Sequence, residues 1–319
     1  MKWAKWGLFS VYMVGVVSAE TVLPKQPGED RPLAERFQNP PAATRILRII
    51  HGQHDAPAEQ DKQLKALAEQ GFGGFAGNVN FTGYVDDPTK WPAFLRGVTM
   101  AKASGMALWL YDECGYPSGS ARDLVLRGHP EWAARGLLVA TTNVAARTAV
   151  TFKAPPGLLV AAVAMPVRDG KWVRAEALHI NTAVTDNVLT WKTPEQGVWC
   201  ILLMTEDFIY HGTHAEVSLA FKKPYINLLM AEPTAKFLQV THDQYAAHLG
   251  QNLGNYFDAT FTDEPSLMSL WMRPQPVQVL PWSPTLVADY RAATGRDLIS
   301  DVPALVGACG SEDAAIRFG

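Results

Sequence analysis

The feature that most restricts the fold of this chain is a regular alternation of strand-like and helix-like segments between residues 44 and 113. The strand-like segments are short runs rich in β-branched residues or interrupted by glycine, and the helix-like segments repeat apolar residues every three or four positions. Strand–helix–strand units of this length connect parallel strands, because an antiparallel pair needs only a tight turn. The expected strands are 44–52, 72–79 and 106–113, and the expected helices are 58–70 and about 88–104.

The pattern changes after Trp132. Short runs with an alternation of two follow one another, separated by turn sequences such as PPG, RDG and EQG, and no long helical period is present. This pattern predicts an antiparallel β-sandwich that is inserted after the third strand–helix unit. The expected strands of the sandwich are 136–144, 148–154, 158–167, 172–180, 188–192, 198–206 and 215–221.

A helical pattern returns at 233–254 and leads into a fourth parallel-type strand, YFDATF. Near the end of the chain, Ser283 is the expected cap of a further helix, Pro284 its first residue and Gly295 its stop signal. Four parallel strands are half of the eight in a closed (β/α)8 barrel. Either the sheet is an open half-barrel or the chain is part of a longer enzyme, and we favour the second interpretation.

The predicted fold class is therefore α/β, with a partial (β/α)8 TIM-type barrel of about four βα units and an inserted antiparallel β-sandwich domain. The expected division places barrel strands one to three in residues 44–135 and the sandwich in residues 136–232. Residues 233–319 would continue the barrel with strand four and the helices that follow it.

The N-terminus predicts export. Lys2 and Lys5 precede a short apolar run, and the small residues at 17–19 offer a cleavage site, so residues 1–19 are typical of a signal peptide. The apolar run is shorter than the roughly 20 residues of a membrane span. Residues 20–43 are rich in proline and charge and are expected to form a linker. The mature protein would be secreted or periplasmic, with no membrane partner once the signal is cleaved.

Composition narrows the class of protein. The net charge of −3 over 319 residues leaves no basic field for nucleic acid. The three cysteines, at positions 114, 200 and 309, lack the spacing of a zinc site or a disulfide framework, although a single bridge between two of them stays open. Ten Trp and nine Tyr suit either a protein that stacks on sugars or an aromatic core.

Paired carboxylates follow two of the predicted parallel strands. Asp112 and Glu113 end the third strand, and Asp263 and Glu264 end the fourth. The carboxyl ends of parallel strands form the rim where catalytic groups lie in an α/β barrel. The glycine- and proline-rich sequence 115–119 forces a tight loop there, whose backbone N–H groups could hold a ligand oxygen. The alternative is an ordinary loop with solvated acids.

Several motifs of the chain resemble those of exported glycoside hydrolases of the α-L-rhamnosidase-like type. They occur in the order of that family over about residues 37–300, so the resemblance covers most of the mature chain. The resemblance implies a TIM-type barrel with a β-domain inserted after the third strand. The matching motifs are FQNPP (37–41), GFGGF (71–75), Trp91, GMALWLYDECGYPSGSA (105–121), THDQY (241–245) and FTDEPSL (261–267).

The resemblance also implies roles for the acids. Glu264 matches the acid that directly precedes proline at the end of the fourth strand in related barrel glycosidases, and is the expected general acid. Asp263 would position this acid or the sugar. Asp112 and Glu113 would bind sugar hydroxyls or a cation. Further candidates for sugar contact lie in the loop after strand three and at the exits of the first two strands: Tyr116, His51, Asp55, Asn78 and Asn80.

Three hypotheses about function follow. Glycosidases use a second carboxylate, about 5 Å from the first for retention and about 6.5–9.5 Å for inversion, and a later strand is expected to supply it. Without it, the chain would be a non-catalytic carbohydrate-binding protein or an inactive fragment. A metal-dependent hydrolase could use His51 with His54, or His211 with His214, but these pairs lack the spacing of helical metal sites. No cofactor or metal is expected beyond a structural cation such as calcium; the sugar and the oligomeric state stay open.

Overall fold

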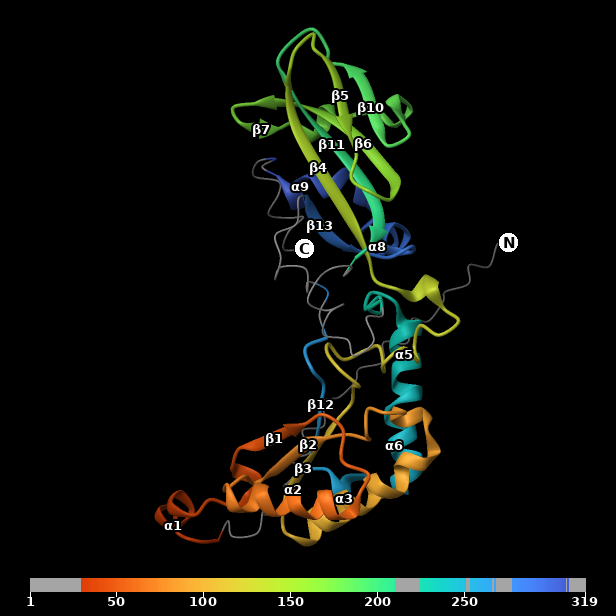
Figure 1. The fold of residues 1–319 in the computed structure, drawn as a ribbon. Helices are drawn as coiled ribbons and strands as arrows, with labels where there is room; N and C mark the ends of the chain where they lie inside the picture. The colour runs from red at the N-terminus through yellow and green to blue at the C-terminus, as the bar shows by residue number, and fades with distance from the viewer. Residues whose placement is uncertain are drawn as a thin grey trace, which may run out of the picture.

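The computed structural model describes residues 30–209, 224–250, 253–265, 267, 277–307 and 309. The expected signal peptide at 1–19, the expected strand at 215–221 and the His211–His214 pair lie outside the described residues. None of the helices in the described part of the chain combines the length and hydropathy that a membrane span requires. Figure 1 shows two regions, one built on a parallel sheet with helices and the other on antiparallel sheets.

The helices and strands are joined by loops and by short 3-10 turns. The parallel region contains α1 (Leu33–Gln38), β1 (Leu47–Ile50), α2 (Pro57–Glu69), β2 (Gly74–Gly77), α3 (Trp91–Ala103), β3 (Ala107–Tyr111), α5 (Ala231–Val240), α6 (His242–Leu249), α7 (Leu253–Tyr256) and β12 (Ala259–Phe261). The antiparallel region contains β4 (Arg135–Ala145), β5 (Ala149–Lys153), β6 (Leu158–Arg168), β7 (Lys171–Trp172), β8 (Leu178–His179), β9 (Val184–Thr185), β10 (Val188–Lys192), β11 (Val198–Phe208), β13 (Gln278–Trp282), α8 (Leu286–Thr294) and α9 (Leu298–Val306).

The four parallel strands form one sheet in the order β1–β2–β3–β12. This confirms the parallel pairing that the alternation of strands and helices predicted. One face of the sheet packs on α2 and α3 through Phe75, Leu108 and Leu110. The expected apolar stripe of α3 is buried in the same core, with Trp91 and Phe94 at 2% and 1% exposure. The mixed α/β class is therefore established by the structure.

The opposite face of the parallel sheet carries no helix in the described part of the chain. Strand register places Ile49, Ala76, Trp109 and Ala259 side by side across the four strands on this face. Trp109 is 39% exposed and Ile49 is 43% exposed. Large apolar side chains in the middle of a sheet are normally covered on both faces when the strands are parallel. The sheet therefore has the exposed inner face of an open half-barrel.

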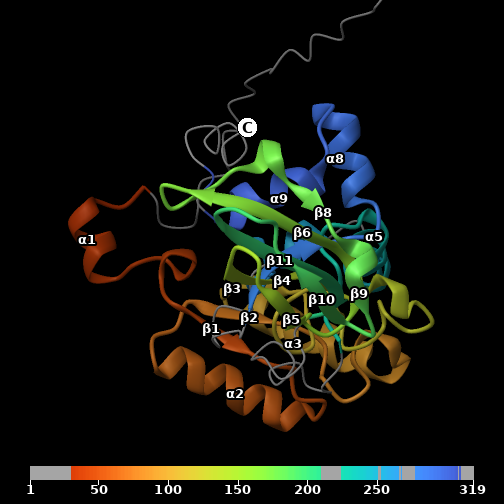
Figure 2. The ribbon, with the colours of Figure 1, turned by 90° about the horizontal axis from the view of Figure 1, so that it is seen from above.

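The antiparallel region has three layers (Figure 2). A six-stranded sheet, in the order β13–β4–β11–β6–β7 with β8 on β6, lies between the small β5–β10–β9 sheet and helices α8 and α9. Successive side chains of a strand point to opposite faces, and β11 shows this alternation. Cys200, Leu202 and Met204 face the helices, whereas Ile201 and Leu203 face the small sheet.

Residues 278–306 differ from the expected assignment to the barrel. β13 pairs antiparallel with β4, so it extends the sandwich sheet. Trp282, Leu298 and Val302 then cover one face of that sheet. The expected helix near Pro284 begins two residues later, at Leu286, although it ends at Gly295 as predicted, with the left-handed φ of 71° that glycine tolerates.

Two other expectations about helices need correction. The expected linker at 20–43 contains the short helix α1 within its described part. The single helix expected at 233–254 is divided at Thr241, whose φ and ψ are −114° and −82°. The carbonyl of Phe237 accepts both the backbone N–H of Thr241, at 3.0 Å, and its hydroxyl, at 2.6 Å, so the last turn of α5 is capped where the chain changes direction. The resulting α5–α6 pair joins the two regions (Figure 1).

Gly74 allows the close approach of β2 and β3. A Cβ atom at this position would lie 1.7 Å from the carbonyl oxygen of Ala107, which is backbone and cannot move without separating the strands. We expect Gly74→Ala to lower the free energy of unfolding by about 2–3 kcal/mol. Gly254→Ala is the matched control, because the added Cβ in helix α7 would meet no heavy atom of the described residues within 4 Å. Urea unfolding of the two variants measures this difference, and equal midpoints would contradict it.

Candidate functional site at the carboxyl ends of the parallel strands

The loop after β3 is built around the side chain of Glu113. This residue is 0% exposed, and its carboxylate accepts five backbone N–H groups at 2.7–2.9 Å. Burial raises the pKa of Glu113, and the N–H donors oppose that shift because they favour the anion. The prediction that Glu113 binds sugar is wrong for this structure, since both oxygens are occupied and inaccessible. The donors belong to Cys114, Gly119, Ser120, Ala121 and Arg122.

Asp112 is also withdrawn from the surface, at 1% exposure. Its Oδ1 accepts the hydroxyl of Ser118 at 2.7 Å, and its Oδ2 accepts the hydroxyl of Thr262 at 2.6 Å. Nε2 of His242 lies 3.7 Å from the same Oδ2. Burial raises the pKa of Asp112, and the two hydroxyl donors act in the opposite direction. Asp112 therefore links strand exits to each other, and the expectation of direct sugar contact is not met.

Ser118 connects the β3 loop to the exit of β12. Its backbone N–H donates to the carbonyl of Asp263 at 2.8 Å, and its Oγ accepts the backbone N–H of Asp263 at 2.8 Å. The backbone N–H of Asp112 also donates to the carbonyl of Phe261 at 3.3 Å. The two acidic strand exits of the sequence are thus brought together, and they are joined by hydrogen bonds between the loops.

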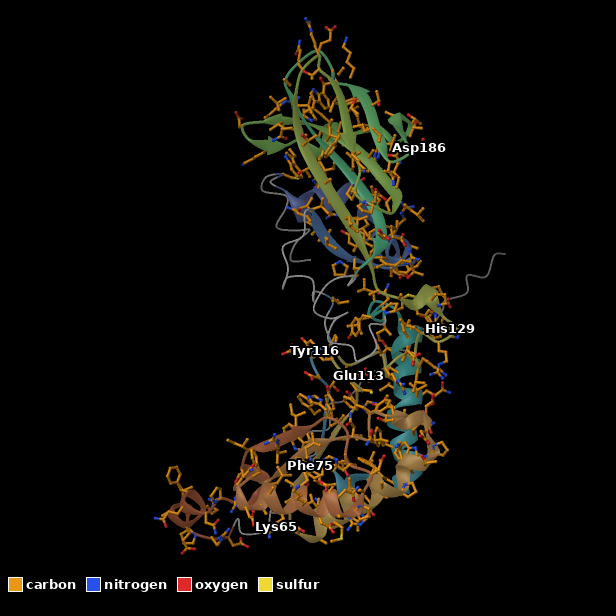
Figure 3. All side chains as sticks on the ribbon, viewed as in Figure 1. Lys65, Phe75, Glu113, Tyr116, His129 and Asp186 are labelled. Carbon is orange, nitrogen blue, oxygen red and sulfur yellow. The ribbon has the colours of Figure 1, made fainter. Side chains whose placement is uncertain are left out.

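Asp263 and Glu264 are the acids that reach the surface of this site. Asp263 is half-buried, with Oδ2 3.0 Å from the hydroxyl of Tyr111. Glu264 is exposed, and its Oε2 accepts the hydroxyl of Tyr116 at 2.6 Å. Figure 3 places Tyr116 and Glu113 at the end of the parallel sheet that faces the antiparallel region. Tyr116, predicted as a sugar contact, is therefore a direct partner of the predicted general acid.

The backbone of Glu264 is unusual, with a φ of 41°. Residues other than glycine rarely adopt positive φ, and those that do are concentrated at functional sites, where the surrounding structure holds them. Asp263, the residue immediately before, is held at both its N–H and its carbonyl by Ser118. The strained residue and the exposed carboxylate thus coincide at one position.

The hydrogen bond to Glu264 raises the pKa of Tyr116 to about 12. A phenol whose folded pKa lies above its unfolded value stabilises the fold below pH 10, and this contribution is lost as the pH rises towards 12. We expect Glu264→Gln to return the pKa of Tyr116 towards 10, because the amide carries no negative charge. NMR titration of ¹³Cζ-labelled tyrosine, with Tyr116→Phe for assignment, measures it. A Tyr116 pKa that stays near 12 in Glu264→Gln, or one that is already near 10 in the wild-type protein, would contradict the role of the Glu264 carboxylate.

The asparagines after β2 have local structural partners. Asn78 is 0% exposed; its Oδ1 accepts the backbone N–H of Gly52 at 2.8 Å, and its amide donates to the carbonyl of Glu113. It therefore ties three strand exits together, and the predicted sugar contact is not available to it. Asn80 is partly exposed, and its Oδ1 accepts the backbone N–H of Thr82 at 2.9 Å in a local turn.

His51 and Asp55, the two candidate residues after β1, have different neighbours. His51 is exposed, and its ring contacts Tyr111 and Phe81, with centroids 5.4 and 5.8 Å away. His51 therefore lies beside the aromatic ring that contacts Asp263. Asp55 instead forms an ion pair with Lys90 at the start of α3, with 2.6 Å between Oδ2 and Nζ. The structure therefore does not bring Asp55 to the acidic residues that follow β3 and β12.

Sequence reasoning missed four residues that organise the site, namely Ser118, Thr262, Tyr111 and His242. All four lie inside the motifs at 105–121, 241–245 and 261–267, yet nothing in the pattern predicted that their side chains would contact Asp112 or Asp263. For Ser118 the available signal was its position beside paired acids in a tight loop.

The described residues offer no cluster of three His, Cys, Asp or Glu side chains that could hold a metal ion. Cys114 and Cys200 are buried free thiols, and burial raises the pKa of Cys114, which makes this thiol a poor nucleophile. The candidate side chains at the strand exits that the structure leaves at least partly exposed include Asp263, Glu264, Tyr116 and His51.

Comparison with known proteins gives a limited result. No protein-family model matches the chain, and no curated protein matches it. A solved structure, a rhamnosidase from Novosphingobium sp. PP1Y, aligns with 88% of this chain at 11% sequence identity and a TM-score of 0.47. The alignment covers 43% of that enzyme, so this chain spans less than half of its length.

Proposed function

We propose that this chain belongs to an exported glycoside hydrolase that cleaves glycosidic bonds of oligosaccharides or polysaccharides, with Glu264 as its general acid. The observation that carries the proposal is the placement of Glu264. Its exposed carboxylate follows a parallel strand, has a strained backbone and is held by the Tyr116 hydroxyl at 2.6 Å. Catalytic groups in α/β barrels lie at this end of the strands.

The chemistry assigned to each group follows from its contacts. Tyr116 holds Oε2 of Glu264, so Oε1 would carry the proton to the departing glycosidic oxygen. Asp263, half-buried against Tyr111, would bind the sugar or orient Glu264. His51 at the same rim would contact sugar hydroxyls. No cofactor takes part in this proposal, and the protein would act outside the cytoplasm because of its N-terminal sequence.

The parallel sheet would be half of a TIM-type (β/α)8 barrel. The exposed inner face with Trp109 and Ile49 supports this, because four further strands would cover that face. In the described part of the chain, β1 and β12 each pair on one side only, which leaves two edges for closure. The second catalytic carboxylate would come from the other half, because Asp112 and Glu113 are buried.

The second candidate function is a non-catalytic carbohydrate-binding protein. The burial of Asp112 and Glu113 favours it, since only one of the two expected acid pairs reaches the surface. Such a protein would use the same rim to bind sugars without cleaving them. Both candidate functions predict that the protein binds sugars, but only the glycosidase predicts that it cleaves them.

A panel of oligosaccharides and aryl glycosides separates these functions. For the glycosidase we expect release of reducing ends by the wild-type protein and its loss in Glu264→Gln. Glu195→Gln is the control, because this exposed turn residue lies in the antiparallel region. Binding by calorimetry without release of sugar would favour the binding protein. If the protein neither binds nor cleaves any of these sugars, both candidate functions are overturned.

A further inference from the structure

One side chain, that of Ser118, contacts both acidic strand exits. Its hydroxyl lies 2.7 Å from Oδ1 of Asp112 and 2.8 Å from the backbone nitrogen of Asp263. Ser118 is 1% exposed, so it cannot contact a substrate. A serine that is buried between two loops and bonded to both can act on a reaction only through the groups it holds.

The direction of these hydrogen bonds is fixed by chemistry. An ionised carboxylate only accepts, so the single hydroxyl proton of Ser118 points to Asp112. The lone pairs of the same oxygen are then available to the backbone N–H of Asp263. Asp112 holds Thr262 in the same way through its other oxygen, at 2.6 Å. The buried anion therefore orients hydroxyls from both loops, and the exit of β12 is held against the loop after β3.

We propose that Ser118 is a positioning residue that fixes the backbone of Asp263 and thereby aims the carboxylate of Glu264. This inference rests on the proposed function for its catalytic consequence, but not for the hydrogen bonds themselves. The hydrogen bonds from Ser118 fix Asp263, the residue immediately before Glu264. Glu264 has a φ of 41°, and a backbone conformation of this kind needs support from the surrounding structure. A displacement of about 1 Å at a reacting group can lower the rate roughly 100-fold.

Three variants test the proposal. Ser118→Ala removes both hydroxyl contacts but keeps the backbone N–H that donates to the carbonyl of Asp263. Ser118→Thr keeps a hydroxyl and is the conservative rescue. Ser120→Ala is the matched control, because the Ser120 hydroxyl is equally buried, two residues away, and has no hydrogen-bond partner among the residues that the structure describes. If Ser118→Ala does not fold, Ser118→Cys, which offers a weak donor and acceptor of similar size, replaces it.

The first measurement is independent of activity. Amide hydrogen exchange by NMR should show the Asp263 N–H protected in the wild-type protein and about tenfold faster in Ser118→Ala. The second measurement is turnover: kcat should fall about 10- to 100-fold in Ser118→Ala while KM stays within about twofold. Ser118→Thr should restore most of both values, and Ser120→Ala should change neither.

The outcomes separate the two claims. Unchanged exchange of the Asp263 amide in Ser118→Ala would overturn the proposal, whatever the activity. Wild-type kcat in Ser118→Ala, together with loss of turnover in Glu264→Gln, would also overturn it while leaving the proposed function intact. If the wild-type protein cleaves no glycoside, the proposed function fails, and amide exchange then decides the role of Ser118 alone.

Discussion

Replacing Glu113 with alanine is expected to lower the free energy of unfolding by about 3–5 kcal/mol. The carboxylate of Glu113 accepts five backbone N–H groups of its own loop, four of them in buried hydrogen bonds and that of Arg122 in a partly buried one. Alanine would remove this acceptor from a site where Glu113 itself is 0% exposed to water. Urea unfolding monitored by circular dichroism measures the loss, provided that the slope of the transition is unchanged.

Glu113→Gln tests whether the stability of the fold depends on the charge and on both oxygens of the Glu113 side chain. Each oxygen of Glu113 accepts at least two N–H groups, so an amide must point its own N–H₂ at donors whichever way it is turned. We expect Glu113→Gln to cost about 2–4 kcal/mol. Asp123→Ala is the control in the same segment, because its exposed pair with Arg127 contributes at most about 1 kcal/mol. A loss in Glu113→Gln no larger than in the control would contradict the role of Glu113.

Glu264→Gln is expected to lower kcat on substrates with poor leaving groups by about 10²–10⁴-fold. Glutamine keeps the size of the side chain and can accept the hydroxyl of Tyr116, but it cannot deliver a proton. The substitution lies at an exposed position, so the protein should stay folded and lose at most about 1 kcal/mol from the weaker contact with Tyr116. Loss of activity together with loss of structure would leave the acid unassigned, whereas normal activity would remove Glu264 from the mechanism.

The alternation of strands and helices was sufficient to predict the parallel sheet. Apolar residues at α-helical spacing, such as Trp91 and Phe94, indicate a buried helix face, and strands that alternate regularly with helices are typically parallel. The sequence could not place β13, because a short alternating run can extend either sheet. Its pairing with β4 is decided by long-range register, and helices α8 and α9 follow it to the sandwich.

The acidic strand ends were also predictable, but their burial was not. Sequence identified Asp112, Glu113, Asp263 and Glu264 as equivalent pairs, whereas the structure makes the first two internal and the last two accessible. The difference arises from the loop after β3, where backbone N–H groups converge on Glu113. Convergence of this kind depends on backbone angles across several residues, and no spacing of residue types reveals it. Glycine-rich turns directly after an acid are a signal for such an internal anion.

The comparison of leaving groups in Glu264→Gln tests the central claim most directly. A general acid matters most when the departing oxygen is a strong base, and little when the leaving group is an activated phenol. Both proteins would be assayed with an alkyl or sugar glycoside and with the dinitrophenyl glycoside of the same sugar. The account predicts that the loss in kcat/KM is at least about 100-fold larger for the alkyl or sugar glycoside. An equal loss for both leaving groups, or no loss for either, would contradict the assignment of Glu264 as the acid.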